Sequence, residues 1–392
     1  MKCIPPSFRR LVLVAPLALA ALATAPASAQ IVVGADEGGQ SIAARYFAVN
    51  SPMPSSPYSP GFQGGVRVAV GDVNGDGVAD IITGPGPGAA PHVKVFDGTN
   101  NQLIHSFFAY SPSFAGGVFV AAGDINGDGA ADIITGAGPG AGPHVKVFDG
   151  RTGAEIRSFF PFAPNFSGGV RVAAGDVNGD GFADIIAGAG PGGGPQVGIT
   201  DGTSNTVLHS FFAYPPTFSG GVFVAAGDID GDGRAEVVTG PGDGAPPQVN
   251  VFNPENPALN QSFFVGSTDN FRGVRVGTHM GSNGIIAILI GLLLPNDVVD
   301  VHLRSATGGA IRGGDLSTAL FNGAHVFVAG TPRPTCRADF NHDGTLNPDD
   351  LADYIGCFFA TPPCDRADYN AGGETNPDDL ADFIGAFFAG CP

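Results

Sequence analysis

The chain has 392 residues, of which 18 are basic and 36 acidic, and its formal net charge is −18. Nucleic acid and anionic membranes are poor partners for so acidic a surface. The 62 glycines and 33 prolines accompany 43% hydrophobic residues that fall in short regular runs, so the composition favours an all-β fold over disorder.

Residues 1–29 have the features of a signal peptide. Three basic residues precede the apolar run Leu11–Ala23, and Ala27-Ser28-Ala29 resembles a cleavage site, so we expect cleavage after Ala29. The mature chain would be secreted or bound to the cell surface, with 15 basic and 36 acidic residues and a net charge of −21. The other long apolar run, Ile285–Leu294, is too short to cross a bilayer, and no membrane span is predicted.

A 52-residue repeat dominates the next part of the chain. Two predicted strands, Ile31–Asp36 and Ile42–Val49, resemble the middle of a unit, and the first complete unit begins at Gly64. It contains four short apolar runs, which read GGVRVAV, ADIITG, HVKVFDG and LIHSFFAY. Four antiparallel strands in each unit predict the blades of a β-propeller, which is stable only when neighbouring blades stack.

The centre of each first strand gives the expected number of blades. Six positions spaced 52 residues apart alternate between arginine and phenylalanine: Arg67, Phe119, Arg171, Phe223, Arg275 and Phe327. This spacing predicts six blades over residues 30–330, with a seventh in the irregular Ser51–Pro60 region as the alternative. Because the N-terminus supplies strands two to four of a unit and Gly323–Gly330 supplies a first strand, we expect strand exchange between the chain ends to close the ring. The six side chains should then gather near the central axis.

An acidic loop joins strands one and two of four units. GDVNGDGVAD at Gly71–Asp80 returns three times, with oxygen-bearing groups at alternate positions, a pattern that suits a hard cation such as calcium. The expected ligands are Asp72, Asn74, Asp76, the Val78 carbonyl and Asp80; Asp124, Asn126, Asp128, the Ala130 carbonyl and Asp132; Asp176, Asn178, Asp180, the Phe182 carbonyl and Asp184; and Asp228, Asp230, Asp232, the Arg234 carbonyl and Glu236. The unit that begins at Gly273 lacks this loop.

Two other interpretations of the acidic loops need no structural cation. Asn-Gly hairpin turns would leave the same acids solvated, although clustered carboxylates repel one another unless a cation neutralises them. Catalytic carboxylate pairs are the other alternative, but catalysis requires one asymmetric site with two differently tuned acids rather than four copies in register.

The repeat resembles the FG-GAP (VCBS-type) repeat of integrin α-subunit propellers and of many secreted bacterial proteins. The resemblance covers about residues 31–330 and rests on the D-x-[DN]-x-D-G-x-x-[DE] loop followed by a Gly/Pro segment and a V-x-V-F strand. It implies calcium in the loops and a ligand on the opposite face. That face would consist of the loops near Gly84–Pro91, Gly136–Pro143, Gly188–Pro195 and Gly240–Pro247, and of linkers that contain Phe62, Phe114, Phe166 and Phe218.

A Pro-rich linker, 331–335, leads to a second region at 336–392, where two loop-helix copies begin 29 residues apart. This region resembles a dockerin, which implies calcium loops and a cohesin-like partner. The implied ligands are Asp339, Asn341, Asp343, the Thr345 carbonyl, Asn347 and Asp350, and in the second copy Asp368, Asn370, Asn376 and Asp379. Gly372 replaces an acid in the second copy, and prolines and aspartates replace the hydroxyl residues that meet cohesin, so surface attachment or assembly is the broader expectation.

All four cysteines beyond the signal lie in this small region, as is usual for exported modules with small cores. Three pairings are possible. We favour Cys336–Cys391 and Cys357–Cys364 over a four-thiolate zinc site, because no C-x-x-C spacing occurs.

The sequence therefore supports three functions. The first is a non-catalytic calcium-binding propeller for adhesion or extracellular assembly, whose partner is a protein or a glycan. The second is a calcium-dependent lectin or an accessory component of polysaccharide degradation. The third is a polysaccharide lyase or hydrolase, against which stands the absence of an asymmetric cluster of acid, base or nucleophile in the sequence.

Overall fold

The computed structural model describes residues 31–35, 43–46, 52–55, 57–59, 61–256, 260–280, 286–293, 299–304, 310–317 and 326–330. These residues are all-β and form a β-propeller of four-stranded antiparallel blades. They contain no helix long and apolar enough to cross a membrane. The predicted signal peptide and the dockerin-like region, including its helices and cysteines, lie outside the described residues.

Four blades carry the complete 52-residue unit, and each is named here by its first strand. They are β4 (Val66–Gly71), β5 (Asp80–Pro85), β6 (His92–Phe96) and β7 (Leu103–Phe108); β8 (Val118–Gly123), β9 (Asp132–Ala137), β10 (Val145–Phe148) and β11 (Glu155–Phe159); β12 (Val170–Gly175), β13 (Asp184–Ala189), β14 (Gln196–Thr200) and β15 (Val207–Phe212); and β16 (Val222–Gly227), β17 (Glu236–Pro241), β18 (Gln248–Phe252) and β19 (Gln261–Phe264).

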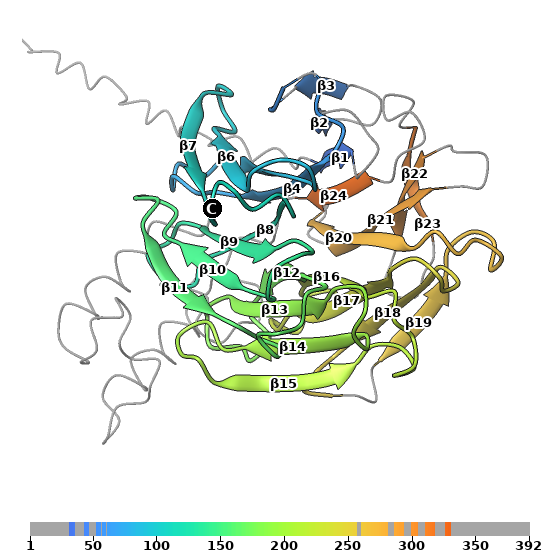
Figure 1. Cartoon of the computed structure of the whole chain (residues 1–392). Helices are drawn as coiled ribbons and strands as arrows, with labels where there is room; N and C mark the ends of the chain where they lie inside the picture. The colour runs from blue at the N-terminus through green and yellow to red at the C-terminus, as the bar shows by residue number, and fades with distance from the viewer. Residues whose placement is uncertain are drawn as a thin grey trace, which may run out of the picture.

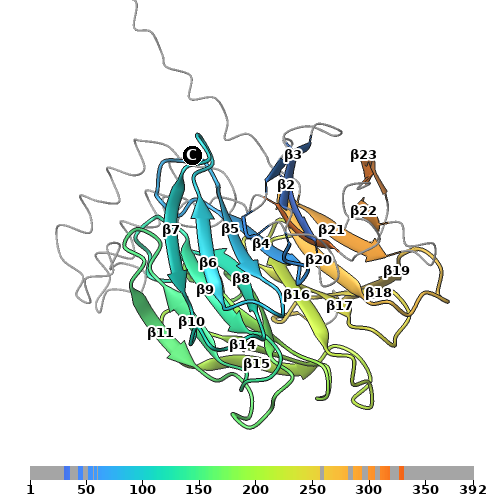
Figure 2. The ribbon, with the colours of Figure 1, turned by 45° about the horizontal axis from the view of Figure 1, so that its top comes forward.

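Two further four-stranded sheets stand beside these blades. One consists of β20 (Val274–Met280), β21 (Ile286–Leu293), β22 (Val299–Arg304) and β23 (Ala310–Ser317), and the other has the order β24 (Val326–Gly330), β1 (Ile31–Ala35), β2 (Ala43–Tyr46) and β3 (Pro52–Ser55). The first strands lie at the centre and the fourth strands at the outside (Figures 1 and 2). Successive first strands lie side by side from β4 to β24, and β24 lies beside β4.

The two ends of the propeller sequence meet in one sheet, as the repeat predicted. β24 pairs antiparallel with β1, so that Ala329 is opposite Val32 and Phe327 is opposite Gly34. The Ser51–Pro60 region, where a seventh blade was the alternative, contributes β3 as the fourth strand of this same sheet. Because β24 and β1 pair with each other, neither strand has an exposed edge where they meet.

The sheet that begins with β20 differs from the predicted pattern. This unit lacks the acidic loop, and β20 continues to Met280 and pairs along its length with β21. The apolar run at 285–294 forms the long strand β21. The acidic turn sequence is absent between β20 and β21, so no metal ligands have to face inward at this turn. Both β20 and β21 therefore extend further than the equivalent strands of the other blades.

Adjacent blades are packed backbone to backbone through a glycine in each second strand. Gly84 lies opposite Arg67 in the β4 blade, and a Cβ at Gly84 would come within 2.6 Å of the Val118 carbonyl oxygen in the next blade. Gly136, Gly188 and Gly240 have the same relation to Val170, Val222 and Val274. The first and second strands, which are mostly apolar, are therefore largely buried on both faces, and the core runs continuously between blades.

The alternating residues of the first strands lie where the repeat predicted. The guanidinium of Arg67 lies 3.8 Å from the centre of the Phe119 ring, and that of Arg171 lies 4.5 Å from the centre of the Phe223 ring. The Arg275 guanidinium lies 4.2 Å from the centre of the same Phe223 ring. These five side chains line one central cavity of about 130 Å³. We call them the axial ring: Arg67, Phe119, Arg171, Phe223 and Arg275.

Candidate metal centre

The first aspartate of each acidic loop shapes the turn. Asp72 accepts backbone hydrogen bonds from Gly75 (2.7 Å) and Asp76 (3.1 Å) at Oδ1, and from Gly77 (2.8 Å) at Oδ2. Gly75 and Gly77 have φ angles of 74° and 84°, a region that glycine adopts without strain. Asp124, Asp176 and Asp228 bond to the equivalent glycines of their loops. Burial raises the pKa of Asp72, and for Asp176 it raises the pKa to about 6.

The second and third predicted ligands fold back over the turn. Asn74 Oδ1 accepts a bond from the Asp76 N–H, and Asp76 Oδ1 accepts one from the Val78 N–H, both at 2.8 Å. In the other three loops, the aspartate at the third ligand position accepts the same bond from the N–H of the residue two positions later, whose carbonyl is a predicted ligand. Asp128 accepts it from Ala130, Asp180 from Phe182 and Asp232 from Arg234. The carbonyl groups of Val78, Ala130, Phe182 and Arg234 thus follow a fixed turn, and their role as ligands stays a prediction.

The last acid of each loop is buried and ties the loop to the rest of its blade. Asp132 is fully buried, and its Oδ2 accepts bonds from the N–H groups of Ile125 (3.0 Å) and Asn126 (3.2 Å). Its Oδ1 accepts a bond from Gly150 N–H (3.0 Å), in the turn after strand three. Burial raises the pKa of Asp132 to about 7, although these donors oppose the shift. Asp80 and Asp184 have the same three partners in their own blades.

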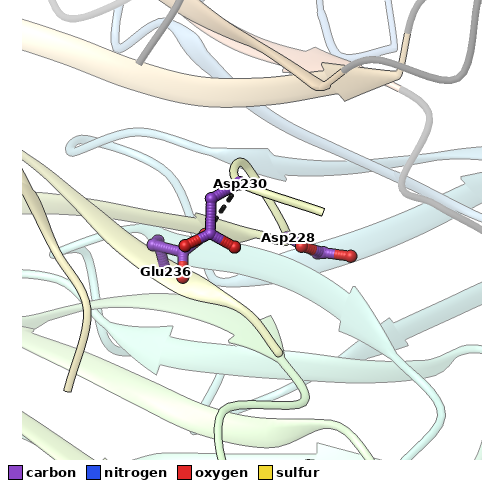
Figure 3. Close-up of side chains that lie close together, drawn as sticks. All are labelled: Asp228, Asp230 and Glu236. Atoms are coloured by element: carbon purple, nitrogen blue, oxygen red, sulfur yellow. Dashed lines mark hydrogen bonds between the residues drawn. The ribbon is translucent and has the colours of Figure 1, made fainter. Parts of the chain in front are cut away.

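The fourth loop brings three carboxylates together. One carboxylate oxygen from each of Asp228, Asp230 and Glu236 lies within 4.8 Å of the others, and Figure 3 shows these side chains around the turn. This is the one such group among the described residues. The loops that begin at Asp72, Asp124 and Asp176 have asparagine at the second ligand position, whereas this loop has Asp230.

The fourth loop has the donor set that calcium prefers. Burial, with smaller contributions from nearby acids, raises the pKa of Asp230 and raises that of Glu236 to about 7. Desolvated and mutually repelling carboxylates are stabilised when a cation joins them, and six to eight oxygen ligands at short range are what calcium takes. The residues of this loop therefore fit a calcium ion.

A set of residues in the turn after strand three supports the acidic loops and was not predicted. Gly98, Gly150 and Gly202 donate backbone hydrogen bonds to the last acid of the loop, and Asn253 donates through its side chain to Glu236 Oε1 at 3.0 Å. Asn126 also donates to Asp149 Oδ2 at 3.0 Å, next to Gly150. A signal was present, because an Asp-Gly pair recurs with the same 52-residue period at the end of strand three.

Successive acidic loops are hydrogen-bonded to one another. The Ala131 N–H donates to the carbonyl oxygen of Asp72 at 2.7 Å, which joins the second loop to the first. Ala183 donates to Asp124 at 2.8 Å and Ala235 to Asp176 at 2.6 Å in the same way. The four loops thus form a continuous bonded series along one end of the blades.

The opposite end of the blades carries aromatic side chains. A cavity of about 400 Å³ lies between the β4 and β8 blades, where Tyr110, Phe114 and Phe160 are among its lining residues. The Tyr110 hydroxyl donates to the His144 carbonyl oxygen at 2.7 Å, and the His144 ring stacks on Phe160 with centres 4.5 Å apart. This end includes the Gly/Pro loop and the linker that were expected to face a ligand.

The remaining predicted ligands lie outside the described residues. They are the dockerin-like set Asp339, Asn341, Asp343, Thr345, Asn347, Asp350, Asp368, Asn370, Asn376 and Asp379, and the four cysteines Cys336, Cys357, Cys364 and Cys391.

Comparison with known proteins supports the repeat. Residues 64–93 and 168–207 match the model of the FG-GAP repeat. Integrin alpha-V from Gallus gallus is 28% identical over 207 residues, and integrin alpha pat-2 from Caenorhabditis briggsae is 27% identical over 216 residues; each match covers 45% of this chain. The chain contains FG-GAP repeats on a β-propeller. The matches span 20% and 18% of the length of these two relatives.

A solved structure agrees on the fold alone. A variant of AofleA from Arthrobotrys oligospora superposes with a TM-score of 0.50 at 11% sequence identity, over 78% of this chain and 87% of that protein. So distant a match says nothing about the ligand of this chain.

Proposed function

We propose that this protein is a secreted or cell-surface, calcium-binding propeller that mediates adhesion or extracellular assembly without catalysis. The observation that carries the proposal is the group of three carboxylates at Asp228, Asp230 and Glu236, in a loop that recurs four times in register. The FG-GAP matches and the two integrin α relatives support an extracellular ligand-binding role. We further infer that all six sheets belong to one ring, since their first strands follow one another back to the start.

Calcium in the fourth loop would be held by Asp228, Asp230, Asp232, the Arg234 carbonyl and Glu236. When bound, it would supply positive charge that offsets the repulsion among these acids and would fix the turn. The ligand would then bind at the opposite, aromatic end of rigidly held blades. The equivalent residues of the other three loops would hold three more ions, and the dockerin-like region one or two.

The absence of catalysis follows in this proposal from the symmetry of the acids. Each loop uses its last acid in the same way, as an acceptor of two N–H groups from its own loop and of one donor from the turn after strand three. Four equally treated carboxylates do not form the differently tuned pair that acid-base chemistry requires.

Calorimetry on the metal-free full-length protein tests the proposal. Titration with calcium at neutral pH should give four ions in the propeller and one or two more in the dockerin-like region. The Asp228→Asn/Asp230→Asn variant should bind one ion fewer, whereas Asp269→Asn, at an exposed acid outside the loops, should bind the original number. Fewer than three bound ions at millimolar calcium would contradict the proposal.

A calcium-dependent lectin is the second candidate, and the cavity beside Phe160 favours it. Aromatic walls with a few polar groups suit the apolar face of a sugar ring. His144, Lys146 and Ser111 also line this cavity, and the Phe160 side chain is 45% exposed.

A glycan array decides between the two candidates. Glycan binding that is lost in chelator and in Phe160→Ala, but kept in Phe212→Ala, would establish the lectin. Phe212 is the matched control, because it occupies the same position of the 52-residue repeat but lies opposite Gln196 in place of a histidine. Absence of binding to any glycan, together with calcium-dependent capture of an extracellular protein, would favour adhesion or assembly.

A further inference from the structure

The axial ring brings three buried cations to the centre of the molecule. Arg67, Arg171 and Arg275 are 5%, 8% and 8% exposed, and each is the second residue of a first strand. The protein as a whole carries a net charge of −18, so these arginines form a local concentration of charge opposite to that of the whole protein.

Aromatic rings hold the guanidinium groups in place. The Phe119 ring centre lies 3.8 Å from the Arg67 guanidinium and 5.5 Å from that of Arg171. The Phe223 ring centre lies 4.5 Å from Arg171 and 4.2 Å from Arg275. In addition, Nη1 of Arg67 donates to the Pro85 carbonyl oxygen and Nη1 of Arg171 to that of Ala189. These contacts orient the cations but add no negative charge.

The charged residues in the described lining of this cavity are all basic. The lining contains the three arginines, the two phenylalanines, and valine, alanine, glycine and threonine residues of the first strands, and no aspartate or glutamate. The acid that approaches the ring is Asp243, whose Oδ1 lies 3.9 Å from Arg275 Nη1 on an exposed side chain. Like charges repel strongly where little water screens them.

Packing does not require arginine at these positions. The same fold places phenylalanine at the equivalent position of the β8 and β16 blades, where it is equally buried. A ring of six phenylalanines would fill the axis without the cost of burying charge. Arginine in alternate blades is therefore explained better by a ligand than by the fold.

We propose that the axial cavity binds a small oxyanion. Guanidinium groups donate paired hydrogen bonds to carboxylate, sulfate and phosphate, and they do so most strongly where water is excluded. A cavity of about 130 Å³ admits an ion of this size. This site is independent of the acidic loops and of their calcium.

Titration calorimetry with inorganic sulfate tests the proposal on the full-length, calcium-loaded protein. Ionic strength is held constant with chloride, so that general screening does not change during the titration. We expect one saturable sulfate site per chain. Arg171→Met, which keeps most of the apolar stem, should weaken sulfate binding at least tenfold. The sulfate affinity of Arg171→Lys should lie between that of Arg171→Met and that of the original protein. Arg151→Met, at an exposed arginine near the acidic loops, should bind sulfate like the original protein.

Phosphate and acetate identify the class of oxyanion. Tighter binding of sulfate and phosphate than of acetate would indicate a tetrahedral dianion, and the reverse order would indicate a carboxylate. Arg275→Met is a second test of the site, should Arg171→Met fail to fold. No saturable binding of any of the three anions, or equal binding by the original protein and both methionine variants, would overturn the proposal.

Discussion

The two ends of each blade have diverged differently within one repeat. At the acidic end, the first aspartate accepts bonds from the same two glycines in all four blades, and the last ligand position is a buried acid in each. At the other end, the same structural positions change between blades. Tyr110 becomes Phe162 in the linker that precedes β12. Its hydroxyl partner Thr135 becomes Ala187, and Lys146, whose ammonium lies 5.8 Å from the Tyr110 ring centre, becomes Gly198.

This difference separates two kinds of task. Identical loops suit identical ions, since every copy must present the same oxygens in the same geometry. Variable positions suit recognition, because a ligand can be distinguished only by surfaces that are not all alike. The acidic end would then stabilise the propeller, and the aromatic end would bind its partner.

The largest expected effect is that of calcium removal. Chelation should lower the melting temperature sharply, because an ion that binds only the folded state stabilises it by about 2.7 kcal/mol per site when its free concentration is 100 times its Kd. Scanning calorimetry with and without chelator measures this. The same melting temperature with and without chelator would mean that the loops bind no calcium.

The stability of the calcium-free protein should depend on pH in a defined direction. Burial raises the pKa values of Asp132, Asp184 and Glu236 to about 7, so the folded state binds more protons than the unfolded state above the ordinary carboxyl pKa. Their contribution to stability is complete below about pH 4 and is lost as the pH rises through 7. In chelator, the melting temperature should therefore fall between pH 5 and pH 8, and calcium should reduce that fall.

The next effect separates the buried acid from the exposed acids of one loop. In chelator, Asp132→Ala should destabilise the protein by about 3 kcal/mol or more, because three backbone N–H groups lose their acceptor in a buried place. Asp128→Ala removes the bond from the Ala130 N–H and a solvent-exposed ion pair with Arg151, and should cost about 1 kcal/mol. Urea unfolding of both variants measures the difference, and equal losses would mean that Asp132 has no special structural role.

At the aromatic end, Tyr110→Phe should cost about 1–2 kcal/mol, because the hydroxyl bonds to the His144 carbonyl and, at 3.1 Å, to Thr135 are lost together. The reciprocal variant, Phe162→Tyr, can regain a carbonyl acceptor at Gln196, as Tyr214 does at Gln248, but no hydroxyl partner, since Ala187 replaces threonine, and it should gain less stability than Tyr110→Phe loses. A comparable gain in the second variant would show that the threonine contributes nothing.

The smallest expected effect lies in the axial ring. A double-mutant cycle between Arg171→Met and Phe223→Leu should give a coupling energy of about 0.5–2 kcal/mol, as for a desolvated cation–π contact. Unfolding of the single and double variants supplies the cycle. Simple additivity would mean that the two side chains merely fill adjacent space.

Much of the fold could be predicted from the sequence, because the repeat is strictly periodic. The 52-residue spacing located the four strands of each blade, the pairing of the two chain ends and the axial position of Arg67 and its equivalents. The sequence did not predict the extent of β20, because the acidic pattern that follows the other first strands is absent from this unit.

The candidate site could be predicted only in outline. The spacing of acids along one loop identified the positions, but it could not show that Asp132 is buried or that Gly150 donates to it, since that contact joins residues 18 apart. The sequence shows that Asp230 replaces asparagine in the fourth loop, but it could not show that three carboxylates converge there. Such features depend on how turns from different strands meet in space.

The pairing of β24 with β1 has a consequence for how the chain is made. A ribosome produces β1 among the first strands and β24 as the last, so β1 lacks its inner neighbour for roughly 15 to 60 s at ordinary rates of synthesis. During that interval its exposed edge accepts any strand of similar sequence, and every blade of a neighbouring chain offers one. The characteristic error of this architecture is therefore an exchange between two incomplete molecules, in which the closing strand of one completes the ring of the other.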